Sequence, residues 1–293
     1  MSAIVLTESK HPSADGKAKF DALVGIDNHK DSLIATLSTL LAPDLLHAWM
    51  NKHHKGGLAY FVKMPKAAPL IVLSGDVGCG KTALANCVGS PVGKLLDRRI
   101  LVLETPSDIR GGGLVGELSL RITEAFEQAR RRGAKEPTIL IIDESDDVAT
   151  SRSQSQAHHE DRAGVNVLIK QLDLIARDGI AMAVIMITNR ELSLDPAVLR
   201  RAALILKFDR PEDESRAKLF ERMLEGTDVT SSKIQKLVKA TNTTIPYTYS
   251  DLTDRVGQLA LRMSWQTDRP FSAEVLQEAI ALVVPSPQFK EEK

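Results

Sequence analysis

The sequence predicts an α/β fold, a doubly wound parallel five-stranded sheet followed by a C-terminal all-helical lid domain. Two observations support this fold class. Short unbroken apolar runs alternate with segments of helical period over the first 210 residues, and after Pro211 the runs stop while helical patterns continue. Unbroken apolar runs are typical of strands that are covered on both faces, as in a parallel sheet between helices. We therefore expect an α/β domain over residues 21–210 and a helical domain over residues 211–293.

The elements are expected in the following order. Residues 1–20 are polar and rich in small side chains, and we expect them to form a flexible tail. The five strands are expected at residues 70–73, 100–103, 139–142, 180–187 and 204–208. Between strands, apolar side chains recur on one face of each expected helix, at Leu118, Ile122, Phe126 and Ala129 and again at Val165, Leu168 and Leu172. Four further helical patterns, at residues 212–224, 231–240, 249–263 and 272–284, make up the lid domain.

The composition excludes several classes of protein. Apolar residues make up 43% and charged residues 26% of the 293 residues, as in ordinary globular proteins. Lys plus Arg and Asp plus Glu are balanced at 38 each, so the chain lacks the basic character of a dedicated nucleic-acid binder. The start has no signal-peptide pattern, and the longest apolar run, at residues 180–187, is much shorter than the roughly 20 residues that span a bilayer. We expect a cytoplasmic protein with no membrane or nucleic-acid partner. The two cysteines, Cys79 and Cys87, agree with a reducing compartment, because a disulfide between them would disrupt the turn described next.

The stretch GDVGCGKT at residues 75–82 lies between the first expected strand and a helix. It matches the pattern G-x-x-x-x-G-K-[ST], in which glycines turn backbone N–H groups toward phosphate oxygens and the following helix adds its positive end. Lys81 is expected to neutralise the β and γ phosphates of ATP, and the Thr82 hydroxyl to ligate Mg2+. A glycine turn that happens to precede a helix is the alternative, which the complete match disfavours. The expected nucleotide-binding residues of this loop are Gly75, Val77, Gly78, Cys79, Gly80, Lys81, Thr82 and Ala83.

Asp143 and Glu144 follow the third expected strand, in TILIIDESDD. The carboxyl ends of parallel strands are where open α/β sheets place their ligands. Asp143 is expected to hold Mg2+ through a water molecule, and Glu144 to polarise the water that attacks the γ phosphate. Such a pair also occurs as a helix cap, but the phosphate loop upstream favours the catalytic role.

Asn189 and the pair Arg200 and Arg201 follow the fourth expected strand. Asn189 ends that strand at the same edge of the sheet, where its amide is expected to orient the attacking water. The two arginines end a short helix in LDPAVLRRAA, without an obvious acidic partner. They are either C-terminal helix caps or arginine fingers that reach the γ phosphate of a neighbouring subunit. Their short distance from Asn189 favours the fingers.

Taken together, these motifs resemble the AAA+ ATPases, and the resemblance covers nearly the whole chain. LVG at residues 23–25 resembles the stretch that contacts adenine, which implies that Val24 and Gly25 bind the nucleotide. LDPAVLRR resembles the arginine-finger box, and TYSDLTDRVGQLALRM the beginning of the helical lid. The resemblance implies a homo-hexameric ring that hydrolyses ATP and pulls polypeptide through a central pore.

Within this family, DESDDVATSRSQSQAHHEDRAGVNVLIKQLDLI and the last eighteen residues resemble the pachytene-checkpoint type. Those ATPases remodel HORMA-domain proteins, and their bacterial relatives are encoded in antiphage signalling systems. The resemblance therefore implies a HORMA-domain protein as the partner. Three alternatives remain: another AAA+ unfoldase or chaperone with a different target, a phosphotransferase, and a DNA-loading protein. A phosphotransferase would leave Asn189, the two arginines and the lid without a role, and the neutral charge balance disfavours DNA.

The sequence departs from this resemblance at two places. The first pore loop should carry an aromatic followed by an aliphatic residue, whereas Leu114 and Val115 stand here behind three glycines. We expect these two residues to contact the substrate with an apolar but non-aromatic surface. Asp251 stands where the checkpoint group usually has a lid arginine, and Arg255 is the nearest substitute.

Overall fold

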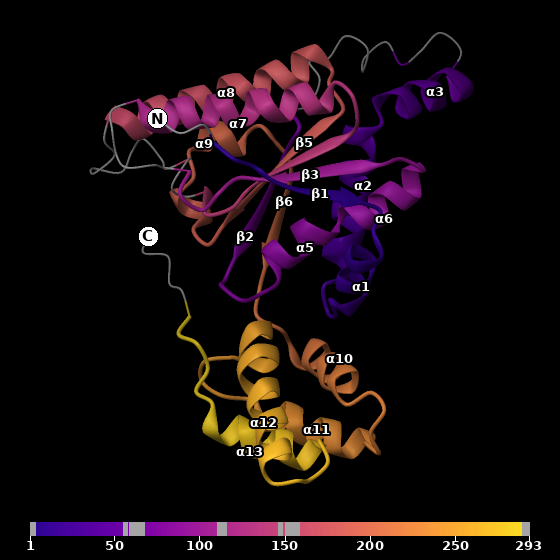
Figure 1. Cartoon of the computed structure of the whole chain (residues 1–293), viewed down its shortest axis with the longest axis vertical. Helices are drawn as coiled ribbons and strands as arrows, with labels where there is room; N and C mark the ends of the chain where they lie inside the picture. Colours follow the sequence, from indigo (N-terminus) through magenta and orange to yellow (C-terminus); the bar gives the residue numbers. More distant parts are fainter. Residues whose placement is uncertain are drawn as a thin grey trace.

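The computed structural model describes residues 4–54, 58, 68–109, 116–145, 149 and 159–288. A six-stranded sheet lies between two helical layers, and a smaller group of helices packs at one end of it (Figure 1). The α/β fold with a parallel sheet is confirmed. The five expected strands are β2 (Leu70–Gly75), β3 (Ile100–Glu104), β4 (Thr138–Ile142), β5 (Met182–Thr188) and β6 (Ala202–Phe208), and they are mutually parallel.

The N-terminal segment is not the flexible tail that we expected. Residues Thr7–His11 form β1, which pairs antiparallel with β3, and Ala14–Ala22 form α1. The sheet order is therefore β1-β3-β4-β5-β2-β6, with one antiparallel edge strand. A polar sequence can form β1 because four of its five side chains are exposed and the strand is held by backbone hydrogen bonds. Its last residue, His11, is buried, and its Nδ1 lies 2.7 Å from the Ser90 hydroxyl of α6 (Gly89–Leu96).

Alternating side chains of the strands supply two separate cores. In β2, Leu70 and Val72 pack into the core on one face, whereas Ile71 and Leu73 pack into the core on the other. The first face is covered by α7 (Glu117–Gly133) and α8 (His159–Asp178), and the second by α2 (Asp27–Leu41), α5 (Lys81–Cys87) and α6 (Figure 1). The predicted apolar faces of α7 and α8 are buried, as the helical period requires. Because helices cover both faces of the sheet, the central strands appear in the sequence as unbroken apolar runs.

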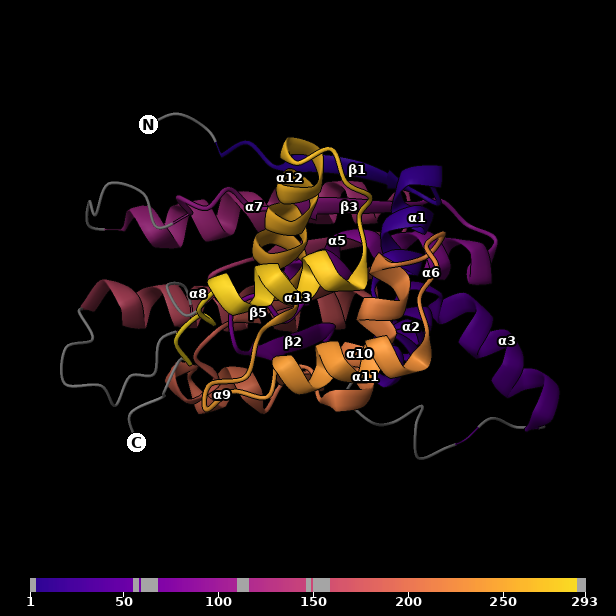
Figure 2. The ribbon, with the colours of Figure 1, turned by 90° about the horizontal axis from the view of Figure 1, so that it is seen from below.

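The C-terminal helices have a core of their own, which contains Phe220, Leu237, Leu252 and Leu276. They are α10 (Asp213–Met223), α11 (Ser231–Ala240), the π-helix η3 (Asp251–Gly257), α12 (Gln258–Gln266) and α13 (Ala273–Leu282). Seen from below, these lid helices lie across one end of the α/β domain (Figure 2). The connection from the sheet to the lid is residues 209–212, between β6 and α10.

Short elements and α3 complete the described chain: α3 is Pro43–His53, η2 is Glu191–Ser193 and α9 is Pro196–Leu199. Within the described residues, no single helix is long and apolar enough to cross a membrane. The pair α2 and α3 reaches the required length and composition together, but the two helices meet at 86°. The α2 residues Leu33, Leu37 and Leu41 are buried in the core of the sheet.

Candidate functional site

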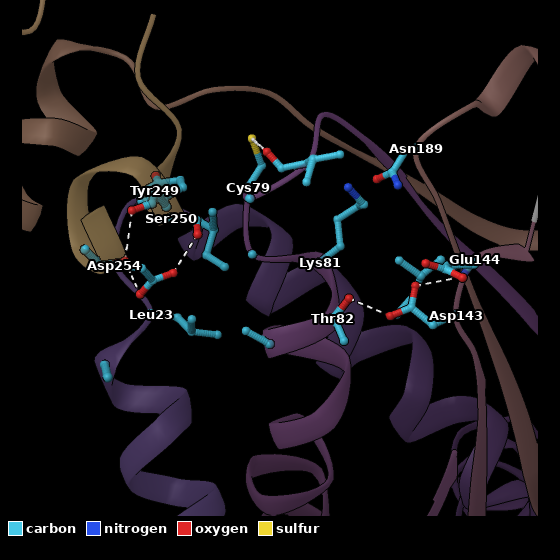
Figure 3. Close-up of a pocket in the computed structure, with 18 of the residues that line it drawn as sticks. Leu23, Cys79, Lys81, Thr82, Asp143, Glu144, Asn189, Tyr249, Ser250 and Asp254 are labelled. Atoms are coloured by element: carbon cyan, nitrogen blue, oxygen red, sulfur yellow. Dashed lines mark hydrogen bonds between the residues drawn. The ribbon is translucent and has the colours of Figure 1, made fainter. Parts of the chain in front are cut away.

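A pocket of about 620 Å3 lies between the carboxyl edge of the sheet and the lid (Figure 3). Its size is in the range of small-molecule sites. One part is lined by the turn after β2, the ends of β3, β4 and β5, and the start of α5; the other part is lined by the segment after α1 and by the lid. The topology explains this, because β2 lies beside β5 and β4 lies next, so that the turns after them meet at one edge.

The turn after β2 adopts the backbone conformation that its glycines permit. Gly75, Gly78 and Gly80 have φ values of 125°, 74° and 94°, all in the region that favours glycine. A Cβ at Gly75 would lie 2.1 Å from the Phe208 carbonyl oxygen, whereas a Cβ at Gly80 would meet nothing within 4 Å. Gly75 therefore packs the turn against β6, and Gly80 faces the open pocket. Space and backbone conformation at this turn fit a phosphate group.

Lys81 is the first residue of α5 and is 5% exposed. Its Nζ donates hydrogen bonds to the carbonyl oxygens of Gly75 and Asp76, both at 2.8 Å. The ammonium group is thus held inside the turn and lines the pocket. Its charge at this place is suited to bind phosphate oxygens.

Of the other expected residues of the turn, Val77, Gly78, Cys79, Gly80, Thr82 and Ala83 all line the pocket, and Gly75 does not. Val77 is exposed, whereas Cys79 is buried in the core next to the turn. Burial, followed by the nearby Asp76 charge, raises the pKa of the Cys79 thiol to about 11. Cys79 is therefore a packing residue in its neutral form.

Thr82, Asp143 and Glu144 form a connected group (Figure 3). The Thr82 hydroxyl donates to Asp143 Oδ2 at 2.8 Å, and the Glu144 backbone N–H donates to Asp143 Oδ1 at 2.8 Å. The Glu144 side chain is exposed at the pocket, and its φ of 50° is a conformation that residues other than glycine seldom adopt. A hydroxyl and a carboxylate are oxygen ligands of the kind that Mg2+ prefers. The residues present therefore fit a magnesium ion at Thr82 and Asp143.

Asn189 lies at the end of β5 and lines the same part of the pocket as Glu144 and Lys81 (Figure 3). The structure brings these three residues together from the start of α5 and from the ends of β4 and β5, as the sequence predicted. Glu104 also lines this part, at the end of β3, and sequence reasoning missed it. Burial, followed by the nearby Asp143 charge, raises the pKa of the Glu104 carboxyl. Its position as the acidic residue that ends an apolar run was the signal that could have found it.

The two arginines have different surroundings. Arg201 donates from Nε and Nη2 to the Asp173 carboxylate of α8, at 2.9 and 3.1 Å, and from Nη1 to the Ala197 carbonyl. The expectation that both arginines lack an acidic partner was therefore wrong for Arg201, because α8 packs beside α9 and brings Asp173 from far along the sequence. Arg200 is exposed, and the described part of the chain offers it no ion pair. Neither arginine lines the pocket of its own chain.

The lid and the segment after α1 form the other part of the pocket. Val24 lines it, as expected, together with Leu23 and Tyr249. Gly25 does not line the pocket: its φ is 75°, and a Cβ there would lie 2.4 Å from the Tyr249 hydroxyl, so Gly25 packs this segment against the lid. Sequence reasoning missed the lid residues Ser250, Thr253 and Asp254, because only the fold brings them to the pocket.

Asp251 is 1% exposed and lies outside the pocket lining. Burial alone would raise the pKa of its carboxyl, but hydrogen bonds from Ser286, the Thr248 backbone and Arg255 outweigh burial and lower the pKa to about 2. Arg255 pairs with Asp251 at 2.8 Å and does not line the pocket either. The described lid residues that line the pocket include no arginine or lysine. The expected pore residues Leu114 and Val115 lie outside the described part of the chain.

Comparison with known proteins shows the family to which this chain belongs. A model of the ATPase family associated with various cellular activities (AAA) matches residues 71–210. This range holds the turn at residues 75–82, called the phosphate turn below, and also Asp143, Glu144, Asn189 and both arginines. The CD-NTase-associated protein 6 of Escherichia coli strain MS 115-1 is 37% identical over 297 residues, covering 95% of this chain and 93% of that protein. The chain belongs to the AAA ATPase family.

Two solved structures resemble this AAA ATPase over nearly its whole length. A chain in the E. coli MS115-1 HORMA:CdnC:Trip13 complex is 35% identical, with a TM-score of 0.88 and coverage of 97% of this chain and 98% of that chain. Trip13 from Rhizobiales is 34% identical, with a TM-score of 0.72 and coverage of 96% and 98%. These matches confirm the resemblance inferred from the sequence, and they extend over the lid as well as the AAA domain.

Proposed function

We propose that this AAA ATPase hydrolyses ATP in the described pocket and uses the energy to remodel a HORMA-domain protein in bacterial antiphage signalling. The observation that carries the ATPase part is the group of Lys81, Thr82, Asp143 and Glu144 at one end of the pocket. The partner rests on the relatives: a chain of the HORMA:CdnC:Trip13 complex matches this chain along almost its entire length. The two free, buried cysteines support a reducing, cytoplasmic setting.

Each residue at the phosphate end has a separate task in the proposed reaction. Lys81 holds the β and γ phosphate oxygens, and the backbone N–H groups of residues 78–81 surround them. Mg2+ bound by Thr82 and, through a water molecule, by Asp143 would neutralise the charge that develops between these phosphates. The hydrogen bond from Thr82 to Asp143 keeps these two oxygen ligands together.

Glu144 is the proposed base. Asp143 accepts the backbone N–H of Glu144, which fixes the backbone, while the Glu144 carboxylate stays exposed at the pocket. Asn189, across from it, is in a position to orient the attacking water (Figure 3). Glu144 then accepts a proton from that water as it attacks the γ phosphate.

The proposed active assembly is a homo-hexamer, in which Arg200 serves a neighbouring subunit. Arg200 is exposed and outside the pocket of its own chain, while Arg201 ties the end of α9 to α8 through Asp173. An arginine that stabilises the transferring phosphate from another subunit contributes roughly 10³ to 10⁵ in rate in related systems. Leu114 and Val115 remain the proposed residues that contact the polypeptide in the pore.

A different AAA target remains the second candidate function, since fold and site are the same for both. A phosphotransferase is disfavoured because the pocket contains Glu144 and Asn189 in positions to activate water.

The test uses two variants of the purified protein. Lys81→Ala is expected to lose binding of a fluorescent ATP analogue, because the phosphates lose their cation. Glu144→Gln should bind the analogue like the unaltered protein and release phosphate at least about 100-fold more slowly, because it cannot accept the proton. Equal phosphate release by Glu144→Gln and the unaltered protein would show that another residue is the base.

A further inference from the structure

Arg210 lies in the connection between the sheet and the lid, two residues after β6. Its Nε lies 2.6 Å from Asp76 Oδ2, and the two side chains are only 5% and 12% exposed. Asp76 belongs to the phosphate turn, and its other carboxylate oxygen accepts the Val77 N–H at 2.9 Å. The connection between the domains is therefore tied to the turn by a nearly buried ion pair.

The other two nitrogens of the Arg210 guanidinium, Nη1 and Nη2, donate hydrogen bonds to carbonyl groups outside the sheet. Nη1 donates to the carbonyl oxygens of Pro246 and, at 2.9 Å, of Ser286, and Nη2 donates to that of Pro287 at 2.9 Å. Pro246 precedes the lid residues that line the pocket. Ser286 and Pro287 belong to the segment after α13, residues 283–288, which runs back from the lid toward the sheet (Figure 1).

The segment at residues 283–288 is also fixed to the lid. The Ser286 backbone N–H and hydroxyl both donate to the Asp251 carboxylate, at 3.1 and 2.6 Å. The Tyr247 hydroxyl donates to the Val283 carbonyl at 2.7 Å. Asp251 is buried and starts the π-helix that carries Thr253 and Asp254 to the pocket. A displacement of the segment therefore acts directly on the lid.

Asp76 is held from two sides. Arg210 binds its carboxylate, and Lys81 Nζ donates to its backbone carbonyl at 2.8 Å. A phosphate that attracts the Lys81 ammonium competes with this carbonyl. Nucleotide binding therefore changes the hydrogen bond between Lys81 and Asp76. A second link runs from the turn to the lid, where the Ser250 N–H donates to the Gly78 carbonyl at 3.1 Å.

We propose that Arg210 is a positioning residue that transmits nucleotide binding from Asp76 to residues 283–288 and, through Asp251, to the lid. The inference rests on the proposed binding of ATP at Lys81. Within the described chain, the lid residues that line the pocket include no cation that could contact the phosphates directly. Arg210 supplies the cation from behind the turn instead, with a planar group that has enough donors to join three segments.

Hydrogen exchange of the full-length protein tests this relay. Exchange of residues 283–288 is compared with and without saturating ATP in the Glu144→Gln background, where the nucleotide is not consumed. We expect ATP to change exchange in this segment by about threefold or more, and Arg210→Ala to abolish the change while the fluorescent analogue still binds. Arg210→Lys keeps the charge next to Asp76 but cannot reach all three carbonyls, so ATP should change the exchange of residues 283–288 less in this variant. Arg210→Lys replaces Arg210→Ala in the test if Arg210→Ala does not fold.

Arg269→Ala is the control, because Arg269 likewise forms an ion pair with a carboxylate, that of Glu278, but on the lid and away from the phosphate turn. It should leave the response of residues 283–288 intact. An unchanged response in both Arg210 variants would overturn the relay and leave the ATPase assignment standing. Failure of the Glu144→Gln protein to bind the analogue at all would instead overturn the proposed function, and the relay with it.

Discussion

At the residue scale, Asp143, the proposed metal ligand, and Glu144, the proposed base, have different surroundings. Both oxygens of Asp143 are engaged, one by the Thr82 hydroxyl and one by the Glu144 N–H, so Asp143 has a fixed orientation. The neighbouring Glu144 has an unusual backbone φ of 50° and an exposed carboxylate. Adjacent carboxylates therefore have different surroundings, which is how one acid can hold a metal while the next acts as a base.

The buried Asp251 makes stability depend on pH in the acid range. Its folded pKa of about 2 lies below its ordinary value of 3.8, so its contribution is present above about pH 4 and is lost as the pH falls toward 2. The contribution is on the order of 2 kcal/mol. We expect the free energy of unfolding, measured by denaturant titration, to fall less steeply between pH 4 and 2 in Asp251→Asn than in the unaltered protein.

Asp254→Asn is the control for this prediction, because Asp254 lies on the same π-helix but is exposed. The free energy of unfolding of Asp254→Asn should keep the loss between pH 4 and 2 that is assigned to Asp251. Identical acid dependence in Asp251→Asn and the unaltered protein would contradict the assigned role of the Asp251 hydrogen bonds.

At the element scale, the sequence predicted elements whose pattern is local. The five parallel strands and the apolar faces of α7 and α8 follow from side chains close together in sequence. β1 was missed because an exposed edge strand needs backbone partners and not apolar side chains. The phosphate turn was predictable because its residues are contiguous, whereas Asp254 reaches the pocket only through the packing of the lid.

The short helix α9 carries two arginines with different expected effects. Arg200→Ala should leave the free energy of unfolding within about 0.5 kcal/mol of the unaltered protein and lower ATP turnover strongly. Arg201→Ala should cost up to about 1 kcal/mol, because it removes a half-exposed pair with Asp173. Thermal unfolding and phosphate release, measured on the same preparations, distinguish the two effects.

Mixing completes the test of Arg200. Arg200→Ala and Glu144→Gln subunits are each expected to be nearly inactive alone, and to recover part of the activity when mixed, because some interfaces then combine an intact arginine with an intact base. Normal turnover by Arg200→Ala on its own would contradict the proposed role.

At the scale of the whole molecule, the pocket lies between two domains with separate cores. The sheet supplies the groups for the phosphates, and the lid closes the other part of the pocket. A change at the phosphate turn can therefore be converted into a movement of the lid, through the Gly78 and Arg210 contacts. In the proposed hexameric ring, such subunits pass the movement on to a bound polypeptide, the proposed HORMA-domain protein.

The most direct measurement is affinity capture with the Glu144→Gln protein and ATP in a lysate of the native host, followed by mass spectrometry. Lys81→Ala, treated in the same way, is the control that should not hold a substrate. We predict that a HORMA-domain protein is enriched with Glu144→Gln over this control. Enrichment of a different protein, with no HORMA-domain protein among those captured, would contradict the proposed target.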